Sequence, residues 1–156
     1  MEKNLEEWVS RISKSEPELG GFNICPFAKA ALAANKIYIG YIEYEIESYI
    51  EEYVKSCDDF EVIVFFNLKN TLTDRDLLDT IASLQKKIPD MIFLKDHPDS
   101  PGTIGTINTS NGKYPVILVQ PRDKLLSARE KLKKTKYYDY WTEKYKTEIW
   151  SYGNES

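Results

Sequence analysis

The segment EVIVFFNL, residues 61–68, decides the fold of this chain. No uninterrupted apolar stretch in the sequence is longer than the run from Val62 to Phe66. Such a run is typical of a strand that is covered on both faces, as in the middle of an α/β sheet. Further strands are predicted where β-branched and aromatic residues cluster between turn residues. They are IYIGYIEY at 37–44, MIFLK at 91–95 and YPVILVQ at 114–120.

Helices are predicted where apolar residues recur at intervals of three and four. At the start of one of them, Thr73 and Asp76 have the spacing of a capping box. The predicted helices span residues 4–15, 46–58 and 73–88, another begins near Pro26, and C-terminal helices cover residues 122–150. This alternation predicts an α/β protein with a single-layer mixed sheet of about four strands flanked by helices. The sheet is expected to be mixed because no helix separates the last two strands.

Composition limits the class of protein. The chain has 156 residues, which predicts a single α/β domain over residues 1–156. Its formal net charge of −4 argues against nucleic-acid binding by the molecule as a whole. The N-terminal segment is charged, and no window approaches the roughly 18 apolar residues of a membrane span. We therefore expect a cytoplasmic protein with no membrane partner and with reduced cysteines. The cofactor and the oligomeric state are left open.

Cys25 is the first candidate for chemistry, because Pro26 places it at the start of a helix. Unpaired N–H groups and the positive end of the helix dipole lower the pKa of a thiol at such a position. We therefore expect Cys25 to serve as a nucleophile, a redox thiol or a metal ligand. The alternative is a small buried core residue, which is the role expected for Cys57 on the apolar face of helix 46–58.

His97 is the only histidine in the chain, and it follows the strand at 91–95. Its ordinary pKa suits proton transfer near neutral pH, so it is predicted to be a general base or a metal ligand. Asp96 or Asp99 could orient its ring or complete an open metal site with it. The alternative is a structural loop histidine beside a turn-forming proline.

The segment DHPDSPGTIGTINTSNGK, residues 96–113, has no predicted regular structure. Irregular segments of this length in a compact domain are often functional, although a mobile surface loop is the alternative. The polar groups of Thr103, Thr106 and Asn108 could bind a carboxylate or a phosphate. Arg122 follows the strand at 114–120 and is either a clamp for an anionic group or an ordinary surface cation.

The segment GFNICPFAKA, residues 21–30, resembles the signature of the DUF1415 family, whose function is unknown. In that family a tryptophan in an N-terminal helix precedes the signature, as Trp8 does here. A His-Pro step and a Tyr-Pro strand follow it and are similar to residues 97–98 and 114–115. The resemblance implies a shared pocket built from Cys25, His97, Tyr114 and Arg122. Phe27, within the signature, is counted with the predicted substrate-binding residues.

The run Cys25-Pro26-Phe27-Ala28 is also similar to the active-site turn of glutaredoxins, and Tyr114-Pro115 is similar to their cis-proline segment. Ala28 occupies the position of the resolving cysteine. This second resemblance therefore implies a monothiol redox reaction.

These features lead to one main hypothesis, a small-molecule enzyme that acts on an anionic metabolite with Cys25 and His97 as catalytic residues. The predicted substrate-binding residues are Phe27, Asp96, Asp99, Thr103, Thr106, Asn108, Tyr114 and Arg122. Three alternatives are a thioredoxin-like monothiol redox protein, a metal or haem protein, and a non-catalytic binding module. The binding module would use the basic, aromatic C-terminal helices as its contact surface.

Overall fold

A mixed four-stranded sheet forms the centre of the molecule. The computed structural model describes residues 3–104 and 106–152, so the two ends of the predicted domain lie outside the described residues. The strands follow the order β1-β2-β6-β3 across the sheet. They are β1 (Ile37–Tyr41), β2 (Val62–Phe66), β3 (Met91–Asp96) and β6 (Val116–Pro121). β1 is parallel to β2, whereas β6 is antiparallel to both of its neighbours. The predicted α/β class and mixed sheet are confirmed.

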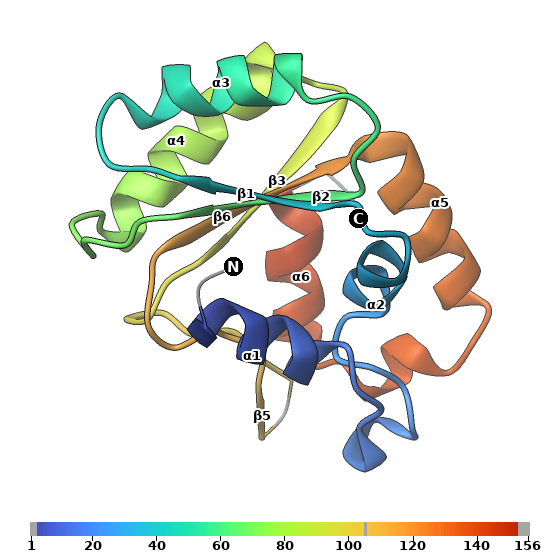
Figure 1. Ribbon diagram of the computed structural model, residues 1–156. Helices are drawn as coiled ribbons and strands as arrows, with labels where there is room; N and C mark the ends of the chain where they lie inside the picture. The colour runs from blue at the N-terminus through green and yellow to red at the C-terminus, as the bar shows by residue number, and fades with distance from the viewer. Residues whose placement is uncertain (1–2, 105, 153–156) are drawn as a thin grey trace.

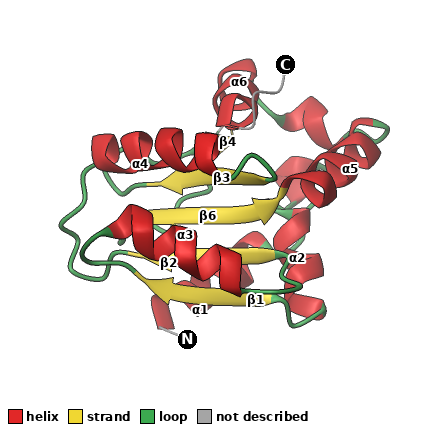
Figure 2. Cartoon of the chain, turned by 90° about the horizontal axis from the view of Figure 1, so that it is seen from above, coloured by secondary structure: helices red, strands yellow, loops and turns green. Residues whose placement is uncertain are grey.

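Helices cover both faces of the sheet and make three layers (Figure 1). One face carries α3 (Ile46–Ser56) and α4 (Asp74–Lys87), and Figure 2 shows the strands from that side. The other face carries the remaining helices. These are α1 (Lys3–Ile12), η1 (Pro17–Leu19), α2 (Pro26–Ala33), α5 (Arg122–Lys133), η2 (Tyr137–Tyr140) and α6 (Glu143–Tyr152).

The central strand β2 contributes to two separate cores. All of its residues are buried, as the apolar run predicts. Successive side chains of a strand point to opposite faces. Ile63 and Phe65 therefore pack with α3 and α4, whereas Val62, Val64 and Phe66 pack with the layer of α1, α2 and η2.

The capping box at the start of α4 is confirmed. The hydroxyl of Thr73 accepts a hydrogen bond from the N–H of Asp76 (3.0 Å), and the Asp76 carboxylate accepts one from the N–H of Thr73 (2.8 Å). Two otherwise unpaired N–H groups are satisfied in this way, which fixes where the helix begins.

The structure corrects several predicted boundaries. The first helix ends at Ile12 and not at 15, because Ser15 pairs with Asn23 in an isolated bridge. The predicted irregular segment 96–113 contains a short hairpin of β4 (Thr103–Ile104) and β5 (Ile107–Asn108). The helical pattern that begins at Tyr138 is interrupted at Trp141, which has an extended backbone and whose ring makes edge-to-face contacts with Tyr137 and Tyr138.

Candidate functional site

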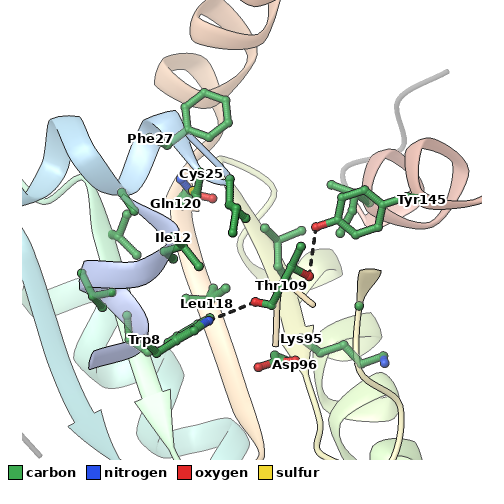
Figure 3. A pocket seen from close by; sticks show the side chains of 18 of the residues that line it. Trp8, Ile12, Cys25, Phe27, Lys95, Asp96, Thr109, Leu118, Gln120 and Tyr145 are labelled. Atoms are coloured by element: carbon green, nitrogen blue, oxygen red, sulfur yellow. Dashed lines mark hydrogen bonds between the residues drawn. The ribbon is translucent and has the colours of Figure 1, made fainter. Parts of the chain in front are cut away.

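A cavity of about 140 Å³ lies between the sheet and the layer of α1, α2, α5 and α6. Most of its wall is apolar, with Val62, Val64 and Leu118 on the sheet and Trp8 and Ile12 on α1. Figure 3 shows Cys25, Phe27 and Gln120 toward one end of the cavity and Trp8 and Asp96 toward the other. The polar or charged groups in the wall are Cys25, Lys95, Asp96, Ser100, Thr109, Gln120, Arg129, Tyr137, Tyr145 and Glu148.

Cys25 occupies the N-cap position of α2, as the sequence predicts. Its backbone is extended, with φ −131° and ψ 93°, and Pro26 starts the helix because its fixed φ suits the first helical position. The thiol does not cap the helix with a hydrogen bond, and Cys25 lines the cavity.

The predicted direction of the Cys25 pKa shift is wrong. Burial raises the pKa of the thiol, because a thiolate loses its hydration in an apolar wall. The N–H groups of Ala28 and Phe27 and the charge of Arg129 act in the opposite direction, and burial outweighs them. Cys25 is therefore a protonated thiol at neutral pH and not an activated thiolate.

Arg129 is a buried cation in the same wall. It lies on α5 and is only 2% exposed. Burial lowers the pKa of its guanidinium, whereas its interactions with Tyr138 and Cys25 raise it. Arg129 is not among the predicted site residues, although in the sequence it shares an apolar helix face with Leu125 and Leu132. An arginine on an apolar stripe is the signal that could have identified it.

Gln120 is the second polar group of the wall that is not among the predicted site residues. It lies near the end of β6, is 8% exposed, and lines the cavity. Because the amide lines the cavity, it is placed to form a hydrogen bond with a polar group of a bound ligand.

Part of the segment 96–113 closes the cavity. Trp8 Nε1 donates a hydrogen bond to the carbonyl oxygen of Thr109 (3.0 Å). The guanidinium of Arg11 donates to the carbonyl oxygens of Asn108 and Ser110. From the opposite side, Tyr145 Oη lies 3.5 Å from Thr109 Oγ1 (Figure 3). These bonds hold α1 and α6 against the loop, so the backbone of residues 108–110 acts as a clasp for α1.

Asp96 lies in the cavity wall, but its carboxylate organises the loop. It is 9% exposed, and Oδ2 accepts hydrogen bonds from the backbone N–H (2.9 Å) and the side-chain amide (2.6 Å) of Asn111. The neighbouring Lys95 is paired with Asp74 of α4, with 2.6 Å between Nζ and Oδ1. Asp96 and Lys95 are therefore both occupied by protein partners and not by a ligand.

His97 is buried, and both of its ring nitrogens face the backbone. Nε2 lies 2.8 Å from the carbonyl oxygen of Leu72, and Nδ1 lies 3.0 Å from the backbone N of Asp99. The carbonyl requires the proton on Nε2, and the N–H of Asp99 requires a lone pair on Nδ1, so the neutral ring fits both bonds. His97 fastens two loops together, and the described wall of the cavity does not include it.

The structure brings only three of the predicted site residues into this cavity. Cys25, Phe27 and Asp96 line it. The described wall does not include His97, Asp99, Thr103, Thr106, Asn108, Tyr114 or Arg122.

Other contacts account for several of the predicted residues outside the wall. Thr106 Oγ1 donates to Glu18, and Asn108 Oδ1 accepts from the N–H of Ser110. Arg122 Nε donates to the carbonyl oxygen of Pro89. A substrate-binding role for these residues stays a prediction.

Two of the alternative hypotheses, a metal protein and a monothiol redox protein, can be compared with the structure. Within residues 3–104 and 106–152, no group of three or more His, Cys, Asp or Glu side chains could hold a metal ion. The peptide bond before Pro115 is trans, and no strand of the central sheet precedes Cys25 in the described chain, in contrast to the glutaredoxin resemblance. Metal binding and monothiol redox chemistry therefore gain no support from the site.

Comparisons with known proteins do not identify a family for this chain. No helix in the described part of the chain has the length and apolar character needed to cross a membrane. No family model matches this chain, and searches of the curated proteins and of the solved structures find no significant match.

Proposed function

We propose that this protein binds a small, largely apolar organic molecule in the cavity between α2, β6 and α6. The observation that carries the proposal is a cavity of about 140 Å³ whose mainly apolar wall includes the Cys25 thiol and the buried Arg129. An apolar protein cavity of about 150 Å³ can take up benzene, so this one has room for a molecule of about that size.

The state of Cys25 favours binding over catalysis. A nucleophilic thiol needs a lowered pKa or an adjacent base. Burial raises the pKa of Cys25, and His97, the predicted base, is hydrogen bonded to backbone groups outside the described wall. In this proposal the thiol is a weak hydrogen-bond donor to the ligand. Its free, reduced state fits a cytoplasmic location, which we also propose.

Titration with toluene, followed by NMR, tests the proposal. Trp8 and Trp141 line the cavity and Trp150 does not, so the indole N–H signals of the first two should shift saturably and the third should shift less. A titration that moves none of the three signals would contradict the proposal.

A matched pair of variants on α2 supplies the control. Ala28 lines the cavity and Ala30 is exposed on the same helix. Ala28→Leu should fill the cavity and abolish the shifts, whereas Ala30→Leu adds the same side chain to the surface and should leave them unchanged. Loss of the shifts in both variants would point to an effect on the helix and not on the cavity.

A thiol enzyme acting on an anionic metabolite is the second candidate, because Arg129 and the N-terminus of α2 both favour a thiolate at Cys25. Alkylation by iodoacetamide in a Cys57→Ser background separates the two candidates. The binding proposal predicts slow alkylation at neutral pH, a rate that rises only above about pH 9, and no effect of His97→Ala. Fast alkylation at neutral pH that His97→Ala slows would favour the enzyme.

A further inference from the structure

The polar groups at one end of the cavity are mainly hydrogen-bond donors. Gln120 is a buried residue, 8% exposed, and its side-chain amide lines the cavity. The N–H groups of Phe27 and Ala28 belong to the first turn of α2, where the helix dipole is positive. Cys25 is the N-cap of this helix and lines the cavity together with Phe27 and Ala28, so the first turn of α2 forms part of the cavity wall.

Arg129 adds a positive charge to this end. Its side chain lines the same cavity as Cys25, and its charge acts to lower the pKa of that thiol. A buried guanidinium, an amide N–H and a helix N-terminus are groups that bind a carboxylate.

Three other charged residues line the cavity, namely Lys95, Asp96 and Glu148. Asp96 accepts two hydrogen bonds from Asn111, and Lys95 is paired with Asp74 on the other side of the sheet. Glu148 on α6 is the one other carboxylate in the described wall, and it would favour a cationic ligand. The experiment must therefore distinguish an acid from an amine.

We infer that the ligand is a small carboxylic acid whose carboxylate lies toward Gln120, Arg129 and the N-terminus of α2. Its apolar body has about six carbon atoms, which is the size that a cavity of this volume accepts. This inference rests on the proposed function, because it assigns a chemical class to the ligand of the same cavity. The Cys25 thiol, protonated at neutral pH, is compatible with a neighbouring carboxylate, whereas a thiolate would repel it.

Calorimetric titration of the unmodified protein with benzoate, benzamide, benzylamine and toluene tests the inference. All four probes carry one six-membered ring; the substituent is anionic in benzoate, cationic in benzylamine, polar and neutral in benzamide, and apolar in toluene. Charge-assisted hydrogen bonds are roughly twice as strong as neutral ones, so benzoate should bind at least about tenfold more tightly than any of the other three probes. A preference for benzylamine would assign recognition to Glu148 and overturn the inference.

Two variants locate the carboxylate. Gln120→Glu keeps the size of the side chain and adds a negative charge, so it should weaken benzoate binding by at least about tenfold and affect toluene much less. Gln120→Met removes the amide without adding charge and should weaken benzoate binding by a smaller factor. Gln85→Glu, in α4 on the opposite face of the sheet, adds the same charge away from the cavity and should leave benzoate binding unchanged.

The possible failures differ from each other. If toluene and benzamide bind as tightly as benzoate, the carboxylate assignment is overturned and the proposed function stands. If none of the four probes binds, both are overturned. Because this comparison uses the unmodified protein, it does not depend on whether the variants fold.

Discussion

Replacing either of two alanines of α2 by leucine should have opposite effects on stability. Ala28 and Ala31 are both buried, at 7% and 0% exposure, and they lie one turn apart on the same helix. Ala28 lines the cavity, whereas Ala31 is not among the described residues of its wall and packs in the filled core. The same change therefore adds carbon atoms to empty space at one site and to occupied space at the other.

The magnitudes follow from the added carbon atoms. Leucine adds three carbons, and burial of each contributes about 0.8 kcal/mol, which gives up to about 2.4 kcal/mol at Ala28. Ordering the leucine side chain opposes this by about 0.5–1 kcal/mol. We expect Ala28→Leu to raise the free energy of unfolding by about 1–2 kcal/mol and Ala31→Leu to lower it by about 1–3 kcal/mol through overpacking.

Urea unfolding followed by tryptophan fluorescence measures both changes. The dependence of the unfolding free energy on urea should stay constant across the unmodified protein and the two variants, since the surface exposed on unfolding hardly changes. Equal destabilisation by the two substitutions would refute the reasoning, because it would mean that no space exists beside Ala28.

Three further predictions concern pH, capping and the clasp. The unfolded chain loses the Cys25 proton near pH 9.0 and the native protein only at higher pH, so stability should fall as pH rises above about 9, with a shallower slope in Cys25→Ala. Burial also raises the pKa of Tyr145 to about 12, which extends the fall to more alkaline pH; a urea series that shows constant stability from pH 8 to 11 would contradict both shifts. Thr73→Ala should lower the free energy of unfolding by about 1 kcal/mol through loss of the α4 cap, and no change in the urea midpoint would show that the cap is dispensable. Arg11→Met should speed amide hydrogen exchange in α1 by about tenfold, because two hydrogen bonds from a charged group are lost; unchanged exchange would mean that Arg11 does not hold α1 to the loop.

Local signals in the sequence predict most of the elements. The continuous apolar run of β2 and the capping box of α4 depend on neighbours within a few residues, and both are present. The order of the strands depends on contacts between distant segments, and no local pattern encodes it. The periodicity also continues through Trp141 into α6, so it does not predict the extended residue there. A distant contact holds this segment, because the Tyr137 hydroxyl donates a hydrogen bond to the carbonyl oxygen of Ile24 (2.7 Å).

The site was predicted less completely than the fold. The position of Cys25 follows from Pro26, but its pKa depends on its burial in the folded chain, which no local pattern shows. The ordinary pKa of histidine makes His97 a candidate base in the sequence. In the structure both of its ring nitrogens face backbone groups, which accounts for its burial. Gln120 is an ordinary residue at the end of a strand, and although Arg129 stands on an apolar helix stripe, only the cavity shows that the two residues share a wall.

A crystal structure of the protein soaked with bromobenzene tests the central claim most directly. The anomalous signal of bromine marks the position of an apolar ring without any assumption about the binding site. The account predicts a single strong peak in the cavity, in contact with Phe27, Ala28 or Leu118. A cavity without a bromine peak, in crystals where bromobenzene binds elsewhere, would contradict the claim that this space is the ligand site.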